Sequence, residues 1–190
     1  MMTAAQTLKE YWGYDSFRPM QEEIISSALE GRDTLAILPT GGGKSICFQV
    51  PALAMEGMAV VISPLISLMK DQVDALQANG VQAEALNSSN TESKNDSIRQ
   101  RCQAGDVRLL YISPERFLAE EQWLQGLRIS LIAIDEAHCI SQWGHDFRPE
   151  YTQLGGLHEH FPGTPIMALT ATADKVTRQD ILDQDRKSVV

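Results

Sequence analysis

The chain has few cysteines, no long apolar run and fewer basic than acidic residues. Its three cysteines, Cys47, Cys102 and Cys139, are odd in number and widely spaced. They form no CxxC pair, so they indicate neither a zinc site nor a disulfide framework. No stretch approaches the ~18 apolar residues of a membrane span, and the first residues lack the basic and apolar regions of a signal peptide. These absences predict a protein of a reducing, intracellular compartment.

Positive charge is also scarce. Lysine and arginine number 16 against 25 aspartates and glutamates, a formal net charge of −9. This balance argues against a protein that holds nucleic acid through an overall positive field. A local DNA track must therefore be built from a few placed residues, or be completed by sequence outside these 190 residues.

The apolar pattern predicts one α/β domain. Apolar residues make up 43% and charged residues 22% of the chain, which is ordinary for a globular protein. Short apolar runs alternate with segments of helical spacing, which predicts a mostly parallel sheet with helices on both faces. The predicted strands are residues 34–38, 58–62, 81–86, 108–112, 129–134 and 165–169. The predicted helices are residues 3–12, 19–29, 46–55, 65–79, 91–103, 114–124 and a last one from about residue 174.

A glycine turn at residues 41–43 is followed by Lys44 and Ser45, between a predicted strand and a predicted helix. This layout is typical of a phosphate-binding loop. Glycines let backbone N–H groups approach a phosphate, and the helix N-terminus adds partial positive charge. Lys44 would reach the β- and γ-phosphates, and the Ser45 hydroxyl would hold Mg²⁺.

The match is partial, because Leu38 stands where the usual pattern has its leading glycine. The alternative is a flexible glycine loop with a chance Lys-Ser pair.

Asp135 and Glu136 follow directly on the apolar strand 129–134. This position places them at the carboxyl edge of a parallel sheet, where α/β folds bind ligands. Asp135 can hold Mg²⁺ on a nucleotide, and Glu136 can polarise an attacking water. A solvated acidic turn is the alternative for this pair alone. Together with the glycine loop about 90 residues earlier, the pair indicates nucleotide hydrolysis.

Tyr14, Arg18 and Gln21 offer an aromatic face, a guanidinium plane and an amide. Such groups could hold a purine, as glutamine does with the edge of adenine. The residues alone favour a simpler interpretation, in which a helix begins at Pro19, Phe17 packs inside and the polar groups are solvated.

Several stretches, in chain order, resemble the motifs of superfamily 2 helicases, and specifically of RecQ DNA helicases. Gly41-Gly42-Gly43-Lys44-Ser45 resembles motif I, which in that family lacks the leading glycine, and Asp135-Glu136-Ala137-His138 resembles motif II, the DEAH box. The remaining resemblances are residues 17–21 to the RecQ motif 0, 63–72 to motif Ia, 141–149 to the aromatic-rich loop and 168–173 to motif III.

The resemblance implies a RecA-like P-loop domain that uses ATP and Mg²⁺ in 3′→5′ unwinding of DNA. It implies catalytic roles for Lys44, Asp135, Glu136 and His138, and Mg²⁺ binding through the nucleotide by Ser45 and Asp135. It reverses the preference stated above and implies adenine binding. The implied ATP-binding residues are Tyr14, Arg18, Gln21, Thr40, Gly41, Gly42, Gly43, Lys44 and Ser45.

The resemblance also implies contact with single-stranded and duplex DNA. Aromatic side chains and a guanidinium suit stacking on bases. The residues implied to sense DNA are Trp143, His145, Phe147 and Arg148, and those implied with His138 to link hydrolysis to DNA are Thr170 and Thr172. The implied location is the cytoplasm, in association with DNA and not with a membrane.

By this resemblance, residues 1–183 form the first RecA-like domain, and residues 1–31 carry motif 0. Residues 184–190 abandon the amphipathic pattern and are interpreted as a truncated or non-native tail. RecQ helicases have a second RecA-like domain with an arginine finger, which these residues do not include. The isolated chain is therefore expected to bind Mg·ATP, to hydrolyse it slowly and to unwind nothing.

Two alternatives remain, and the first of them shares motifs I and II. One is an RNA helicase domain of the DEAD or DEAH type, against which residues 17–21 and 143–148 argue. The other is a non-enzymatic ATP-binding module. Outside the motifs, His158 and His160 lie in a polar helical stretch and are expected to be solvated.

Overall fold

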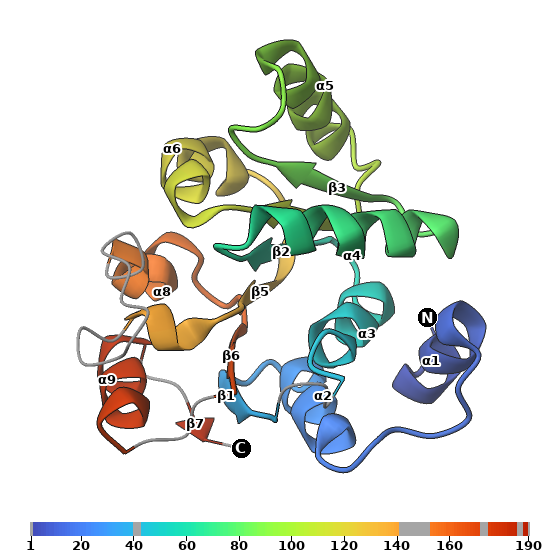
Figure 1. Ribbon diagram of the computed structural model, residues 1–190, viewed down its shortest axis with the longest axis vertical. Helices are drawn as coiled ribbons and strands as arrows, with labels where there is room; N and C mark the ends of the chain where they lie inside the picture. The colour runs from blue at the N-terminus through green and yellow to red at the C-terminus, as the bar shows by residue number, and fades with distance from the viewer. Residues whose placement is uncertain (1, 40–42, 141–152, 172–174, 186–187, 190) are drawn as a thin grey trace.

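The computed structural model describes residues 2–39, 43–140, 153–171, 175–185 and 188–189. The described strands form one sheet in the order β3-β4-β2-β5-β6-β1-β7, and every pair in it is parallel (Figure 1). The strands are β1 Thr34–Ile37, β2 Met58–Ile62, β3 Ala83–Leu86, β4 Leu109–Ile112, β5 Ile129–Ile134, β6 Ile166–Thr170 and β7 Ser188–Val189.

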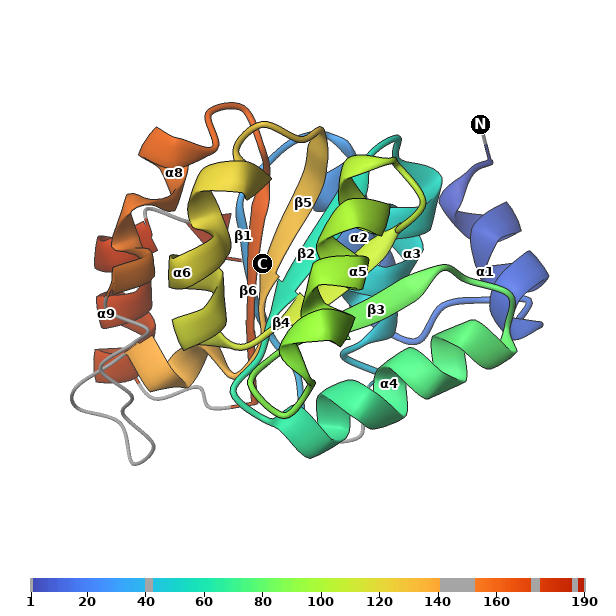
Figure 2. The ribbon, with the colours of Figure 1, turned by 90° about the horizontal axis from the view of Figure 1, so that it is seen from above.

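Helices cover both faces of the sheet, as the alternating pattern predicts (Figure 2). One face packs against α2, α3 and α4, and the other packs against α5, α6, α8 and α9. The described helices are α1 Ala4–Trp12, α2 Gln21–Leu29, α3 Ile46–Ala54, α4 Ile66–Ala78, α5 Glu92–Gln103, α6 Pro114–Leu124, η1 Ala137–Ile140, η2 Gln153–Gly156, α8 Leu157–His160 and α9 Lys175–Asp185. In the part of the chain that the structure describes, no helix is long and apolar enough to cross a membrane.

Burial explains why the central strands are mostly apolar. All residues of β2, β4, β5 and β6 are buried, because helices exclude water from both sides of the sheet. Alternate residues of one strand therefore enter different cores. Leu110 and Ile112 of β4 pack toward α5 and α6, whereas Leu109 and Tyr111 pack toward α3 and α4.

The first helix confirms the sequence-based prediction for residues 3–12. Thr3 caps α1 in a reciprocal capping box with Gln6, and Gly13 ends the helix with a φ of 76°. This left-handed conformation is one that glycine adopts without a steric penalty.

The second helix begins later than predicted. We predict Pro19 in its first turn, but α2 begins at Gln21. Met20 has a φ of 72°, and the Gln21 N–H donates to the Arg18 carbonyl at 3.2 Å. Arg18 to Gln21 therefore form a tight turn with proline at its second position, where the proline ring also fits.

The expectation for the two histidines near residue 160 is wrong in part. His158 Nε2 lies 2.8 Å from Asp33 Oδ2, and His160 Nδ1 contacts Glu121. Both side chains are partly exposed, but each has a carboxylate partner from another element. The polar pattern of residues 157–160 did not reveal these partners, because they are distant in the sequence.

Candidate active site

The glycine loop lies at the carboxyl edge of the sheet, where β1 ends. The Leu38 N–H donates to the Thr170 carbonyl at 3.0 Å, so the chain leaves β1 beside the end of β6. Gly43 has a φ of 74°, and Ser45 is the N-cap of α3. The predicted site residues Thr40, Gly41 and Gly42 lie outside the described residues. What is described of the loop has the strand–turn–helix arrangement that a phosphate-binding loop requires.

Lys44 meets both carboxylates of the predicted motif II. Its Nζ atom lies 3.0 Å from Asp135 Oδ1 and 3.2 Å from Glu136 Oε1. Asp135 follows β5, and its N–H donates to the Ile62 carbonyl of β2 at 2.8 Å, which fixes it at the sheet edge. The fold therefore brings together three of the predicted catalytic side chains.

Glu136 has an unusual backbone conformation. Its φ is 55°, and its N–H donates to Asp135 Oδ1 at 2.9 Å. A non-glycine residue with positive φ is uncommon and costs free energy, and such residues gather at functional sites. Because the chain turns sharply there, both carboxylates face Lys44.

Burial and charge shift the pKa values of this cluster. Burial lowers the pKa of Lys44, but the charges and hydrogen bonds of Asp135 and then Glu136 outweigh it, so the pKa is raised. Lys44 is therefore positively charged at neutral pH. Burial raises the pKa of Asp135, and the opposing effect of Lys44 does not offset it.

These residues fit a magnesium ion. Magnesium prefers oxygen ligands and is usually held by one or two carboxylates together with substrate phosphates. Asp135 is a buried carboxylate whose pKa stays raised despite Lys44, so additional positive charge would stabilise its ionised form. The Ser45 hydroxyl makes no capping hydrogen bond to α3. Asp135 and Ser45 are thus the residues that would hold the ion.

His138 lies next to this cluster. Its Nδ1 atom is 3.1 Å from the Thr170 hydroxyl and 3.6 Å from Glu136 Oε2. The end of β6 and the end of β5 are thereby joined through one imidazole. Other residues predicted to contact DNA or link it to hydrolysis lie outside the described residues, and they are Trp143, His145, Phe147, Arg148 and Thr172.

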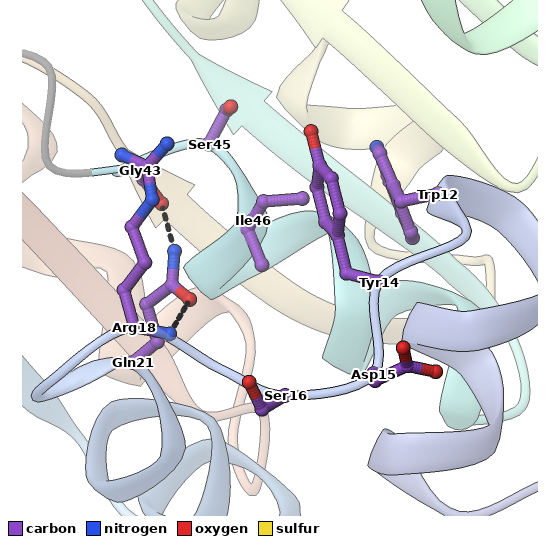
Figure 3. A pocket seen from close by; sticks show the side chains of 9 residues that line it. All are labelled: Trp12, Tyr14, Asp15, Ser16, Arg18, Gln21, Gly43, Ser45 and Ile46. Carbon is purple, nitrogen blue, oxygen red and sulfur yellow. Dashed lines mark hydrogen bonds between the residues drawn. The ribbon is translucent and has the colours of Figure 1, made fainter.

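A pocket of about 530 Å³ opens beside the phosphate loop. Tyr14, Arg18 and Gln21 line it together with Gly43 and Ser45 (Figure 3). The three residues predicted to bind adenine therefore share one pocket with the loop predicted to bind phosphates. The pocket has the size of small-molecule sites in proteins.

Gln21 ties the pocket to the phosphate loop. Its Oε1 atom accepts the Arg18 N–H at 2.7 Å, and its Nε2 atom donates to the Gly43 carbonyl at 3.0 Å. A Cβ atom added to Gly43 would lie 2.3 Å from Gln21 Nε2. Gly43 is therefore required both by its φ and by this close approach of the Gln21 side chain.

The pocket is also lined by four residues that the sequence analysis does not predict as site residues. Figure 3 shows the Tyr14 ring beside Ile46 and Trp12. Trp12 ends α1 and Ile46 is the first residue of α3, so helical periodicity assigns both to packing. The only local signal was their closeness in sequence to Tyr14 and to Lys44. The four residues are Trp12, Asp15, Ser16 and Ile46.

The fold is that of a RecA-like domain. A DEAD-box helicase, Mss116 bound to single-stranded RNA and UDP-BeF, superposes with a TM-score of 0.77 at 16% identity, over 100% of this chain and 42% of that one. The helicase domain of Pyrococcus furiosus Hef gives a TM-score of 0.68 at 19% identity, over 90% of this chain and 36% of that one. At these identities the likeness concerns the fold.

The sequence places the chain in a family. The model of the DEAD/DEAH box helicase family matches residues 18–181, and the chain belongs to this family. It is 58% identical over 182 residues to the ATP-dependent DNA helicase RecQ of Haemophilus influenzae and 50% identical over 189 residues to RecQ of Bacillus subtilis. These alignments cover 95% and 97% of this chain, but only 29% and 32% of the relatives. The chain thus spans about a third of their length.

Proposed function

We propose that this chain is a motor domain of an ATP-dependent DNA helicase of the RecQ type, which unwinds DNA in the 3′→5′ direction. The observation that carries the proposal is the convergence of Lys44, Asp135 and Glu136 beside the helix that follows the glycine loop. The family match and the two RecQ relatives support the choice of reaction.

In the proposed reaction, Lys44 leaves the two carboxylates and pairs with the β- and γ-phosphates of ATP. Asp135 and Ser45 would hold Mg²⁺, which would supply positive charge against the negative charge of the phosphates. Glu136 accepts a proton from the water that attacks the γ-phosphate, as the P–O bond to ADP breaks. Glu136→Gln should therefore retain nucleotide binding and lose hydrolysis.

In the proposed nucleotide complex, Tyr14 stacks on adenine and Gln21 binds its edge. Tyr14 is 56% exposed, so its ring is available to a ligand. A glutamine amide has two N–H groups and two lone pairs, and the contacts to Arg18 and Gly43 use one of each. The remaining N–H and lone pair match the N7 acceptor and N6 donor of adenine.

We extend the proposal to DNA through the relatives. Residues 1–183 would form the domain, with motif 0 in residues 1–31, and the status of residues 184–190 stays a prediction. Trp143, His145, Phe147 and Arg148 would contact single-stranded DNA, and His138, Thr170 and Thr172 would relay that contact to the nucleotide. A role in DNA repair and recombination and a cytoplasmic, DNA-associated location are part of the same proposal, as the resemblance to RecQ helicases implies.

Titration calorimetry with Mg·ATP and Mg·GTP tests the nucleotide assignment. Guanine presents two acceptors where adenine presents a donor and an acceptor, so the parent chain should bind ATP more tightly. Gln21→Ala should narrow this difference, and Gln103→Ala, at an exposed position, should leave it unchanged. Equal affinity of the parent chain for both nucleotides would remove the adenine role. No affinity for either would refute the proposed function for this chain.

The choice between DNA and RNA needs a separate measurement. ATP turnover should be stimulated by single-stranded DNA more than by single-stranded RNA when the chain is joined to its family's second motor domain. Stronger stimulation by RNA would favour the RNA helicase alternative. Nucleotide binding without turnover in either case would favour the binding module.

A further inference from the structure

A buried tyrosine bridges α3 and α4, two of the helices that begin at the carboxyl edge of the sheet. Tyr111 lies in β4 and is 1% exposed. Its hydroxyl accepts a hydrogen bond from Gln49 Nε2 at 2.9 Å and donates one to Gln72 Oε1 at 2.7 Å. Gln49 belongs to α3 and Gln72 to α4. One hydroxyl group therefore connects both helices to β4.

The bridge has a fixed direction. The amide N–H of Gln49 can only donate and the carbonyl of Gln72 can only accept, so the tyrosine hydroxyl must fill both roles. Burial raises the pKa of Tyr111, and the hydrogen bond from Gln49 opposes it only in part, so the hydroxyl stays protonated. Phe48 holds the ring from the side, with ring centroids 6.3 Å apart. Hydrogen bonds of this kind are strong in a low-dielectric interior and costly to leave unmade.

The two helices begin at functionally different places. α3 begins directly after Lys44 and Ser45 of the predicted phosphate loop. α4 follows Ser63-Pro64-Leu65 and carries exposed side chains, among them Leu68, 48% exposed. Figure 1 shows the two helices on the same side of the sheet. The bridge therefore lies between the proposed nucleotide site and a solvent-facing helix.

The register of the strands places Tyr111 near the catalytic carboxylate as well. Val61 of β2 pairs with Tyr111 on one side and with Ala133 on the other. Asp135 lies two residues beyond Ala133, and alternate residues of a strand point to the same face. The charge of Asp135 contributes to the raised pKa of Tyr111. Tyr111 thus lies among α3, α4 and the end of β5.

We propose that Tyr111 is a positioning residue that transmits movement of α3 to α4, so that nucleotide occupancy of the phosphate loop sets the position of α4. This inference rests on the proposed function. A hydrogen bond is lost when the heavy atoms separate beyond about 3.5 Å, so a shift of α3 by ~1 Å must carry Tyr111 and Gln72 with it or break the bridge. Apolar contacts between the same helices do not depend on specific donor and acceptor atoms in this way.

A double-mutant cycle tests the bridge without nucleotide. Gln49→Leu and Gln72→Leu are combined, and urea unfolding is measured for the singles and the double. The effects on the unfolding equilibrium constant should be non-additive by about fivefold. The same cycle carried out with Tyr111→Phe present should be additive. Additivity in the parent chain, or coupling that survives Tyr111→Phe, would overturn the bridge.

Hydrogen–deuterium exchange tests the transmission. Addition of Mg²⁺ and a non-hydrolysable ATP analogue should slow exchange in both α3 and α4 of the parent chain. Tyr111→Phe should keep nucleotide affinity within about threefold, because the hydroxyl does not line the pocket, and should keep the response of α3. It should lose the response of α4. Gln72→Leu, which removes the acceptor of the tyrosine hydroxyl, should likewise keep the response of α3 and lose that of α4.

A matched control removes a buried hydrogen bond elsewhere. Thr34→Val breaks the 2.6 Å contact between the Ser27 and Thr34 hydroxyls, which is also buried but is not part of the bridge. This variant should lose similar stability and keep the response of α4. A parent chain that responds in α3 alone, or a Tyr111→Phe variant that still responds in α4, would overturn the transmission. A parent chain that binds no nucleotide would refute both the proposed function and the transmission, and the double-mutant cycle would still decide the bridge.

Discussion

Two clusters of charged side chains in this domain each contain a buried carboxylate, but the surroundings affect the two carboxylates differently. At the carboxyl edge of the sheet, one cation, Lys44, faces the carboxylates of Asp135 and Glu136. Between α5 and α6, one buried carboxylate, Glu120, faces the guanidinium groups of Arg99 and Arg116. The two clusters use the same kinds of side chains.

The pKa shifts show the difference. Burial raises the pKa of Glu120, but the hydrogen bonds and charges of Arg99, Trp123 and Arg116 outweigh it and lower the pKa below its ordinary 4.5. The pKa of Asp135 stays raised, because Lys44 does not offset its burial. The charge of Glu120 is thus stabilised by groups of the protein itself, whereas the raised pKa of Asp135 means that an added cation would stabilise its charge. The Glu120 cluster stabilises the fold, and we propose that the Lys44 cluster binds the nucleotide and its metal ion.

Among these variants, Lys44→Ala should give the largest effect, a loss of affinity for Mg·ATP. It removes the positive charge that the proposed reaction places on the β- and γ-phosphates. Affinity for Mg·ATP should fall by about 100-fold, as charge-assisted contacts to a desolvated group are worth about 2–5 kcal/mol. Titration calorimetry measures this, with Lys94→Ala on exposed α5 as the control. Unchanged affinity would show that the Lys44 cluster is structural, like the Glu120 cluster.

Glu120→Gln should lower the free energy of unfolding at pH 7 by about 2 kcal/mol, because two guanidinium groups lose their shared carboxylate. The folded-state pKa of Glu120 is lowered, so its stabilisation is present above pH 4.5 and is lost as the pH falls through the folded-state value. The difference between parent and variant should therefore shrink in acid. Urea unfolding at several pH values measures it, and Glu115→Gln, on an exposed part of α6, should change little.

Urea unfolding of Asp135→Asn at pH 7 should not show the loss of unfolding free energy expected for Glu120→Gln. The folded-state pKa of Asp135 lies above its ordinary 3.8, so ionisation of this group costs stability once the pH exceeds that value. Removal of the charge should leave the free energy of unfolding unchanged or raise it. A loss as large as that of Glu120→Gln would contradict the contrast between the two clusters.

Relief of backbone strain at Met20 and Glu136 should give the smallest effect, a change in the free energy of unfolding. Among the described residues, the non-glycine residues with positive φ are Met20 and Glu136, one beside the pocket and the other in the Lys44 cluster. A left-handed conformation costs a residue with a Cβ atom about 1 kcal/mol, and glycine avoids it. Glu136→Gly should therefore be more stable than Glu136→Ala, and Met20→Gly more stable than the parent chain, each by about 1 kcal/mol.

Thermal unfolding of these variants tests the strain. Glu120 lies within α6, where backbone conformation is regular, so Glu120→Gly should instead be less stable than Glu120→Ala. The same order at both positions would show that Glu136 is not strained.

Much of the fold follows from local pattern. Apolar runs of four to six residues predicted β1, β2, β4, β5 and β6, and the alternation with helices predicted a parallel sheet covered on both faces. The start of α2 was predicted wrongly, because the left-handed Met20 lets the turn of Arg18 to Gln21 delay the helix. A methionine gives no signal for that conformation, whereas a glycine would have done so.

The site was predictable as separate motifs. The glycine loop and the Asp-Glu pair each have a residue pattern that their chemistry requires, and each stands directly after a strand. Since the carboxyl ends of parallel strands share one edge, the two motifs were expected at the same edge of the sheet. The residue pattern was therefore enough to predict which residues would carry the proposed chemistry and at which edge of the sheet they lie.

Which side chains are in contact is visible only in the folded structure. β1 and β5 are not neighbours, because β6 lies between them. The order of the strands therefore determines whether Lys44 can contact Asp135 and whether His138 can contact Thr170. The contact of Gln21 with Gly43, the place of Trp12 in the pocket and the bridge from Gln49 through Tyr111 to Gln72 likewise depend on how the elements pack together. Local periodicity encodes how a segment folds and which face it buries, but it contains no information on which distant segment lies beside it.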